Sequence, residues 1–143
     1  MPLYENIPQT TDSNVVMVCG SFNTNTSGNV TLATGFGVTS ITDSAVGVFD
    51  LVLAEKYPYL LSGVACCYHP GSGDFFIDNA ESGIRPRVTY AASTGTLTIT
   101  LYDTTDVTNV PKDPLIDDTP VHWMAFFARA NASGNNTSNI TIA

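Results

Sequence analysis

The chain has 143 residues, of which 43% are apolar and only 13% are charged, and its formal net charge is −8 at pH 7. A chain of this length can form one domain with a substantial buried core. The acidic balance argues against binding to a nucleic-acid backbone, which requires clustered Lys and Arg. No run approaches the roughly 18 apolar residues of a membrane span.

The first part of the chain predicts an extended arm followed by short strands. Met1 to Ser13 contains two prolines, no hydrophobic periodicity and none of the regions of a signal peptide. Apolar runs bounded by turn residues then predict strands. These runs are 15–19, 29–32, 36–42 and 46–53, with a loop from Ser21 to Gly28 and a break at Gly35.

The middle of the chain contains the most regular patterns. In 46–53, the large side chains Phe49, Leu51 and Leu53 alternate with other residues and so share one face. After a corner at 54–60, a strand is predicted over 61–68. The next, 84–91, contains Pro86, which predicts an edge strand or a bulge.

The strand 96–102 alternates strictly, with Leu97, Ile99 and Leu101 on one face and threonines on the other. The turn residues Ser93-Thr94-Gly95 precede it and predict a hairpin with the strand before. A long loop with several aspartates follows at 103–119.

The strand 121–130 is apolar on both faces, which predicts a central strand covered on both sides. We place Phe126 of this strand in one core with Leu51 and Ile99. The polar segment 131–143 ends in an alternation of Ile140 and Ile142 that would suit one further strand.

These patterns predict an all-β fold. No helical pattern of ten or more residues is present, and about eight short strands at intervals of about ten residues indicate a β-sandwich or barrel, jelly-roll-like, with extended termini. We therefore expect an N-terminal arm at 1–13, a single β domain at 14–130 and a C-terminal tail at 131–143.

No group of residues indicates catalysis. The two histidines are His69 and His122, and we expect His122 to be a hydrogen-bonded core residue. Ser72 lacks the strand–turn–helix setting of a nucleophile elbow. We expect no catalytic residue and therefore no enzyme.

Metal and cofactor sites are not expected either. Aspartates of the long loop could gather around Ca²⁺, which prefers about six to eight oxygens, but their spacing matches no EF-hand. We expect a solvated acidic loop, formed by Asp103, Asp106, Asp113, Asp117 and Asp118. The three cysteines, Cys19, Cys66 and Cys67, lack zinc-site spacing and are expected to be reduced buried thiols of a chain folded in a cytoplasm.

Several aromatic residues could instead form a platform for a sugar, but we expect them to pack in the core and at interfaces, where aromatic residues are enriched. They are Tyr57, Tyr59, Phe75, Phe76 and Trp123. Six N-x-S/T sequons occur, at Asn25, Asn29, Asn131, Asn135, Asn136 and Asn139, and we ascribe them to loops rich in Asn and Thr.

Three signatures in order carry a resemblance to a known class of proteins. They are Gly35-Phe36-Gly37-Val38 with 44–51, then Lys56-Tyr57-Pro58-Tyr59-Leu60-Leu61, and finally 95–99 with Val121-His122-Trp123-Met124-Ala125-Phe126-Phe127. Over residues 35–129 the chain resembles small β-rich structural proteins of tailed-phage virions. That family carries no catalytic residues to transfer.

The resemblance implies a non-enzymatic virion structural protein, with capsid decoration (cement) as the first role. Its partners would be the major capsid protein and further copies of itself. The strand that is apolar on both faces and the low surface charge also indicate a homo-oligomer, with a trimer favoured over a dimer. The protein would be made in the host cytoplasm and lie on the capsid exterior. The alternative is a carbohydrate-binding module of a phage fibre or knob.

Overall fold

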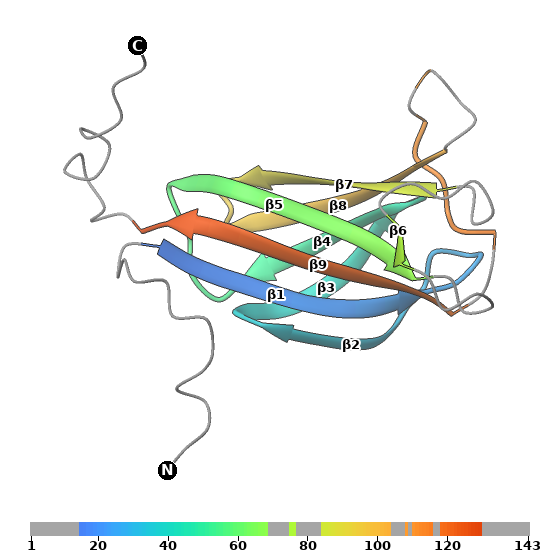
Figure 1. Cartoon of the computed structure of the whole chain (residues 1–143), viewed down its shortest axis with the longest axis horizontal. Helices are drawn as coiled ribbons and strands as arrows, with labels where there is room; N and C mark the ends of the chain where they lie inside the picture. Colours follow the sequence, from blue (N-terminus) through green and yellow to red (C-terminus); the bar gives the residue numbers. More distant parts are fainter. Residues whose placement is uncertain are drawn as a thin grey trace.

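The computed structural model describes residues 15–68, 75–76, 84–103, 108, 110–115 and 118–129. Within these residues the chain forms nine strands in two antiparallel sheets that pack face to face, without a helix (Figure 1). The expected all-β sandwich is confirmed, and the chain does not close into a barrel. No described helix could span a membrane. The expected arm 1–13, the tail 131–143 and the Ile140–Ile142 strand lie outside the described residues.

The two sheets have five and four strands. The five-stranded sheet has the order β2 (Val30–Phe36), β1 (Val15–Thr24), β9 (Thr119–Ala128), β5 (Tyr59–Tyr68) and β6 (Phe75–Phe76). The four-stranded sheet has the order β3 (Val38–Ala45), β4 (Val48–Leu53), β8 (Thr96–Asp103) and β7 (Ile84–Ala91).

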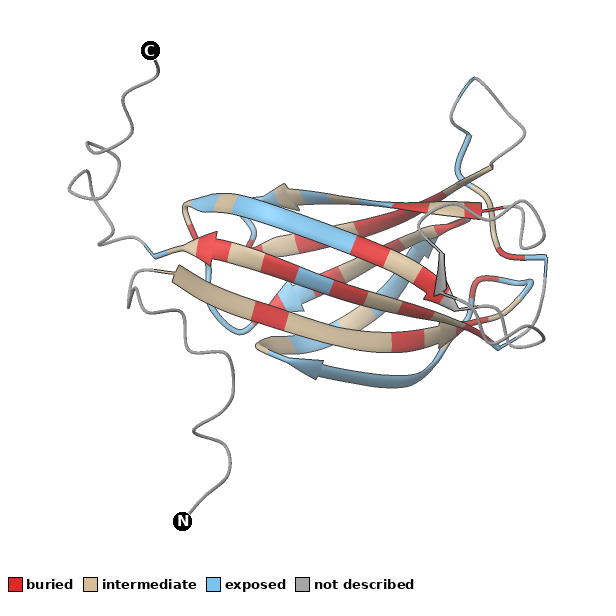
Figure 2. Cartoon of the chain, viewed as in Figure 1, coloured by how far each residue is buried: buried red, intermediate tan, exposed pale blue. Residues whose placement is uncertain are grey.

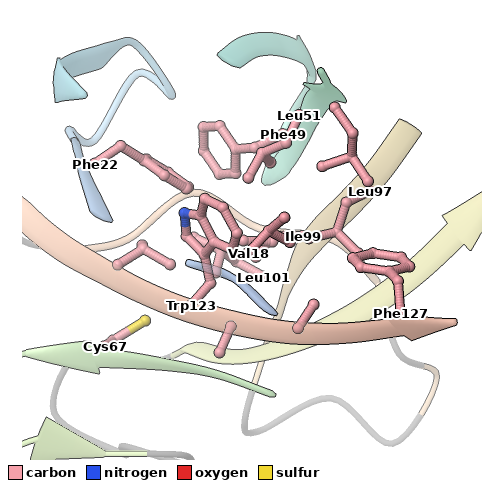
Figure 3. Close-up of a cluster of buried hydrophobic side chains, with 14 of the residues drawn as sticks. Val18, Phe22, Phe49, Leu51, Cys67, Leu97, Ile99, Leu101, Trp123 and Phe127 are labelled. Atoms are coloured by element: carbon pink, nitrogen blue, oxygen red, sulfur yellow. The ribbon is translucent and has the colours of Figure 1, made fainter. Parts of the chain in front are cut away.

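Alternation along the strands builds the core between the sheets. Leu51 of β4 and Ile99 of β8 are fully buried, as their patterns predict (Figure 3). The prediction for Phe126 is wrong, because its neighbour Phe127 is the buried residue and Phe126 is half-buried on the other face. Both faces of β9 are apolar, so hydrophobicity alone cannot decide which one points inward.

Close contacts of aromatic side chains hold the two ends of the core. Trp123 of β9 lies opposite Gly20 of β1, and a Cβ atom at Gly20 would lie 2.8 Å from the indole Cζ2. At the other end of the core, Phe127 stacks on Tyr57 at 4.8 Å and meets Tyr90 edge-on at 4.7 Å between ring centroids. The hydroxyl of Tyr90 accepts from Tyr57 N and donates to Tyr57 O, both at 2.8 Å, which fixes the predicted corner.

The predicted boundaries differ from the structure most clearly around β1 and β2. β1 continues to Thr24, through part of the segment expected to be a loop. The break between β2 and β3 lies at Gly37 rather than Gly35. Gly37 has φ 80°, and a Cβ there would lie 2.6 Å from Val18 Cγ1, so glycine is required for the chain to pass between the sheets.

The second half of the four-stranded sheet follows the prediction. β7 and β8 form the expected hairpin, with Ala91 opposite Thr96 and Gly95 at φ 71° in the turn. Pro86 lies in β7, which is an edge strand of this sheet. Its missing N–H therefore removes no hydrogen bond from an interior ladder.

Candidate functional site

The outward-facing side of the five-stranded sheet is apolar across four strands. Strand register places side chains from β2, β1, β9 and β5 in rows. The central row is Phe36, Cys19, Met124 and Val64, and the neighbouring row contains Met17, Phe126 and Ser62. We call this surface the outer sheet face. It was not expected, because β9 was predicted to be covered on both sides, whereas Met124 is 38% exposed.

The outer sheet face also carries no formal charge. β1, β2, β5 and β9 contain no Asp, Glu, Lys or Arg, although the whole chain has a net charge of −8. Charges in the strands belong to the four-stranded sheet, at Asp43, Asp50, Arg85, Arg87 and Asp103. A neutral partner surface can therefore approach the outer sheet face without meeting a charge on its strands.

The size of this face is that of an interaction surface. Four strands about 4.8 Å apart and roughly seven residues long, at about 3.3 Å per residue, cover roughly 400 Å². Apolar patches of about 300–600 Å² are the largest on typical monomers and are often functional. Phe36 is 65% exposed and Val64 is 42% exposed. Figure 2 shows the same alternation along β9, with buried positions separated by more exposed ones.

The opposite side of the sandwich has a different chemistry. On the outward face of the four-stranded sheet, Asp50 lies opposite Thr98, and Thr98 Oγ1 donates to Asp50 Oδ1 at 2.7 Å. Thr98 is in turn opposite Thr89 of β7. The molecule therefore presents an apolar, uncharged face on one side and a hydroxyl-bearing, charged face on the other.

On the outer sheet face, a histidine and a cysteine lie opposite each other, as a catalytic pair could. His122 lies opposite Ser21 of β1 and Cys66 of β5. It is therefore on the outer sheet face, and the prediction that it is a core residue is wrong. Burial raises the pKa of the Cys66 thiol. A nucleophilic cysteine needs the reverse shift, toward the thiolate. His69 and Ser72, the other residues considered for catalysis, lie outside the described residues.

All three cysteines are free. Only Cys67 is buried as expected, at 1% exposure, and burial raises its pKa to about 12. Cys19 and Cys66 are half-buried on the outer sheet face. Chemical labelling of Cys19 and Cys66 would therefore measure the accessibility of the outer side of this sheet, and labelling of Cys67 that of its inner side.

The described part of the acidic loop is anchored and not simply solvated. Lys112 N donates to Leu101 O at 2.8 Å, and its ammonium lies 2.9 Å from Asp103 Oδ2. Asp113 Oδ1 accepts a 2.8 Å hydrogen bond from Gly47 N, in the turn between β3 and β4. No group of three or more His, Cys, Asp or Glu in the described part of the chain could hold a metal. Asp106 and Asp117 lie outside that part.

We expect Asp113→Ala to lower the free energy of unfolding by about 1–2 kcal/mol, because it leaves the N–H of Gly47 without its acceptor. Asp113→Asn keeps an acceptor oxygen, now that of an amide, and should cost less. Chemical denaturation of the two variants measures the difference. Equal stability of Asp113→Ala and the parent protein would show that the loop is not held by this bond.

Asp43 should make stability depend on pH. Desolvation raises its pKa above the ordinary 3.8, the charge of Asp113 raises it further, and a hydrogen bond from the Ala45 backbone opposes both. A raised carboxyl pKa favours folding most below 3.8, and this contribution is lost as the pH rises through the folded-state value. Asp43→Asn should therefore raise the melting temperature at pH 7 slightly and change it least in acid. A larger gain in acid would contradict this sign.

The aromatic residues considered for sugar binding do not form a shelf. Tyr57 and Trp123 are buried at 4% and 3% exposure, and both belong to the core. Tyr59 is 68% exposed, and the side chains of Phe75 and Phe76 are outside what the structure describes.

Comparisons of the chain with protein-family models, with curated proteins and with solved structures find no match. The outer sheet face is therefore identified from the structure of this chain alone. One signal in the sequence could have found it, since the segments that form β1, β2, β5 and β9 lack charge altogether.

Proposed function

We propose that this chain is a non-enzymatic structural protein of a virion, a decoration protein that binds the shell of major capsid proteins. The observation that carries the proposal is the outer sheet face, which is apolar, uncharged and exposed on a rigid two-sheet core. Such a face suits a broad, flat contact with another protein. The resemblance of residues 35–129 to tailed-phage structural proteins supports the identity of that partner.

The energetics favour repeated binding over one isolated contact. Burial of the whole face, roughly 400 Å², contributes at most about 10 kcal/mol at about 25 cal/mol per Å², because the face also contains polar groups such as those of Ser62 and His122. Association costs about 4–15 kcal/mol in lost freedom, so one contact is marginal. On a shell, many identical sites lie side by side, and copies that also contact one another gain from the high local concentration.

The lining of a groove in the sandwich supports a non-catalytic role. A groove of about 380 Å³ lies between β5 and β7, and Arg87 and Tyr102 are among its lining residues. Arg87 lies over the Tyr102 ring, 5.1 Å from its centroid. The lining contains no carboxylate, imidazole or thiol that could act as a base or a nucleophile.

The alternative function, a carbohydrate-binding module of a phage fibre or knob, has less support. It requires exposed aromatic rings on which a sugar can stack, and Tyr57 and Trp123 are in the core.

A charge on the outer sheet face tests the proposal. Met124→Glu places a carboxylate in the central row, and burial of an unpaired charge should weaken binding to undecorated shells at least about tenfold. Val52→Glu is the matched control, since Val52 is 39% exposed, close to the 38% of Met124, and lies on the outward side of the four-stranded sheet. Copies per shell can be measured by gel densitometry after sedimentation.

Equal binding of Met124→Glu and the parent protein would assign the shell contact to another surface. Failure of the parent protein to bind any shell would overturn the decoration role itself. Circular dichroism of Met124→Glu confirms that the fold is intact.

Thiol labelling gives an independent prediction without charge changes. Iodoacetamide should modify Cys19 and Cys66 in the free protein, and shell binding should protect both. Cys67 should stay unmodified throughout, because it is 1% exposed and its pKa is about 12. Peptide mass spectrometry measures the three sites, and unchanged labelling of Cys19 and Cys66 on the shell would argue against docking through the outer sheet face.

A further inference from the structure

Among the strands that the structure describes, β2 forms an edge of the five-stranded sheet, and β1 is its only hydrogen-bonded neighbour there. The six residues after Val30 are all exposed. Unpaired N–H and C=O groups on an edge strand can pair with a strand of another chain, and proteins usually prevent this with charge, proline, bulges or short strands. β2 contains neither a charged residue nor a proline.

The other edge strands of the described sheets carry such protection. β7 contains Pro86 between Arg85 and Arg87. β3 contains Asp43, and its pairing with β4 is interrupted by two register shifts. β6 has two residues. β2 has one register shift in its pairing with β1 but neither a charge nor a proline, and it is longer than β6, so it is the edge best suited to pair with another strand.

Leu32, on this edge strand, combines a strained backbone conformation with an exposed side chain. In the pairing of β2 with β1, Ser21 lies opposite Thr34 and Asn23 opposite Thr31, so β2 contains one extra residue at this point, as in a β-bulge. Leu32 lies in this bulge with φ 48° and is 78% exposed. A bulky residue at positive φ is a strained outlier, and bulges redirect side chains. The isolated chain thus holds a large apolar side chain in water at a conformational cost.

The space beside this edge is small and uncharged. A groove of about 120 Å³ lies between β2 and β3, and its lining includes Ala33 and Gly35 of β2 and Val38 and Ile41 of β3. Such a groove accepts only small side chains from an added strand. β2 itself offers alanine and glycine at its groove-lining positions, which makes a second β2 a fitting occupant.

We propose that β2 pairs with β2 of a second copy, antiparallel and in the register centred on Thr34. This register places Leu32 of each copy opposite Phe36 of the other, so the two exposed apolar side chains of the strand become cross-strand neighbours. It also places Ala33 opposite Gly35 of the second copy, beside the groove. Two molecules of net charge −8 then meet at a strand without charge.

The pairing goes beyond binding to a shell, because it uses the edge of the sheet and covers the outer sheet face only at its β2 margin, at Phe36. It joins two outer sheet faces into one continuous surface with twice the area. A two-fold contact of this kind gives a dimer, whereas the sequence favours a trimer. The copy number in solution therefore bears directly on the proposal.

A cysteine on the two-fold axis tests the register. Residues directly opposite each other in an antiparallel pair have Cα atoms about 4.5–5.5 Å apart, within disulfide range. In a Cys19→Ser, Cys66→Ser background, Thr34→Cys should form disulfide-linked dimers under mild oxidation. The matched control is Thr89→Cys, an exposed threonine on edge strand β7 of the other sheet. Equal cross-linking of the two variants would overturn the proposal.

Leu32→Gly separates pairing from folding. Glycine adopts φ 48° without strain, so the melting temperature of the monomer should not fall. Cross-linking through Thr34→Cys should drop by about tenfold or more, because the apolar anchor is lost. Phe36→Ser should have the same effect on cross-linking from the opposite side of the pair.

Sedimentation at high concentration completes the test. Dimers that weaken in Leu32→Gly and Phe36→Ser support the edge pairing. A trimer, or cross-linking that neither substitution reduces, would contradict it. Shell binding by Leu32→Gly, measured separately, shows whether the outer sheet face works without the pairing, so the two proposals can fail independently.

Discussion

Phe127→Ala is expected to lower the free energy of unfolding by about 3–5 kcal/mol, the usual cost of removing a buried aromatic side chain. Phe127 has 0% exposure and contacts the rings of both Tyr57 and Tyr90. Its loss leaves a cavity at the end of the core where the corner after β4 is anchored. A loss of this size is a large part of a domain's total stability of about 5–15 kcal/mol.

Phe126→Ala is the matched control, because it makes the same change at the next residue of β9. Phe126 is half-buried on the outer sheet face, so its truncation should cost only about 1 kcal/mol. Urea denaturation of both variants gives the comparison. If Phe126→Ala proved the more damaging, β9 would have to be turned over, with its other face toward the core.

The second large effect is expected at Gly20. A Cβ atom there would lie 2.4 Å from Thr34 O and 2.8 Å from Gly35 Cα, both backbone atoms, and also 2.8 Å from Trp123 Cζ2. Backbone atoms in a paired sheet cannot withdraw without loss of hydrogen bonds. Gly20→Ala should therefore cost about 3 kcal/mol, at the upper end of the usual range for overpacking.

Gly35→Ala provides the comparison for Gly20→Ala. A Cβ at Gly35 would be 3.6 Å from its nearest neighbours, Trp123 Cζ2 and Val38 Cβ, which is an ordinary contact. Gly35→Ala should therefore leave the free energy of unfolding unchanged or raise it by up to about 1 kcal/mol, because alanine reduces the conformational entropy of the unfolded chain. Thermal unfolding followed by tryptophan fluorescence measures both, since the Trp123 indole lies next to both sites. Similar losses in the two variants would show that β1 and β2 can move apart.

The success of sequence reasoning depended on whether the two faces of a strand differ. β4 and β8 alternate between large apolar residues and others, so the inward positions of Leu51 and Ile99 could be predicted. In β9, both faces are apolar, and the prediction chose Phe126 over Phe127. An interaction surface of low polarity removes the contrast from which facing is inferred, so the error fell on the strand at the centre of the candidate site.

The site itself could not be predicted for a related reason. Its rows join β2, β1, β9 and β5, whose register becomes known only when distant parts of the chain are paired. Met124, for example, lies between Cys19 and Val64. The anchoring of the acidic loop is equally non-local, because Asp113 bonds to a residue 66 positions earlier. In contrast, Pro86 acts locally, and its edge position was predicted correctly.

The adjacency of β1 and β9 has a mechanical consequence. The strands are antiparallel with Val15 opposite Ala128, so the described chain enters and leaves the sandwich at the same end (Figure 1). Tension applied through these two ends would open the pair like a zipper, one rung at a time. Each rung contributes about 1 kcal/mol, so little force would be needed. A load applied across the width of the sheets would instead strain many rungs together, and this sandwich is built to resist that direction.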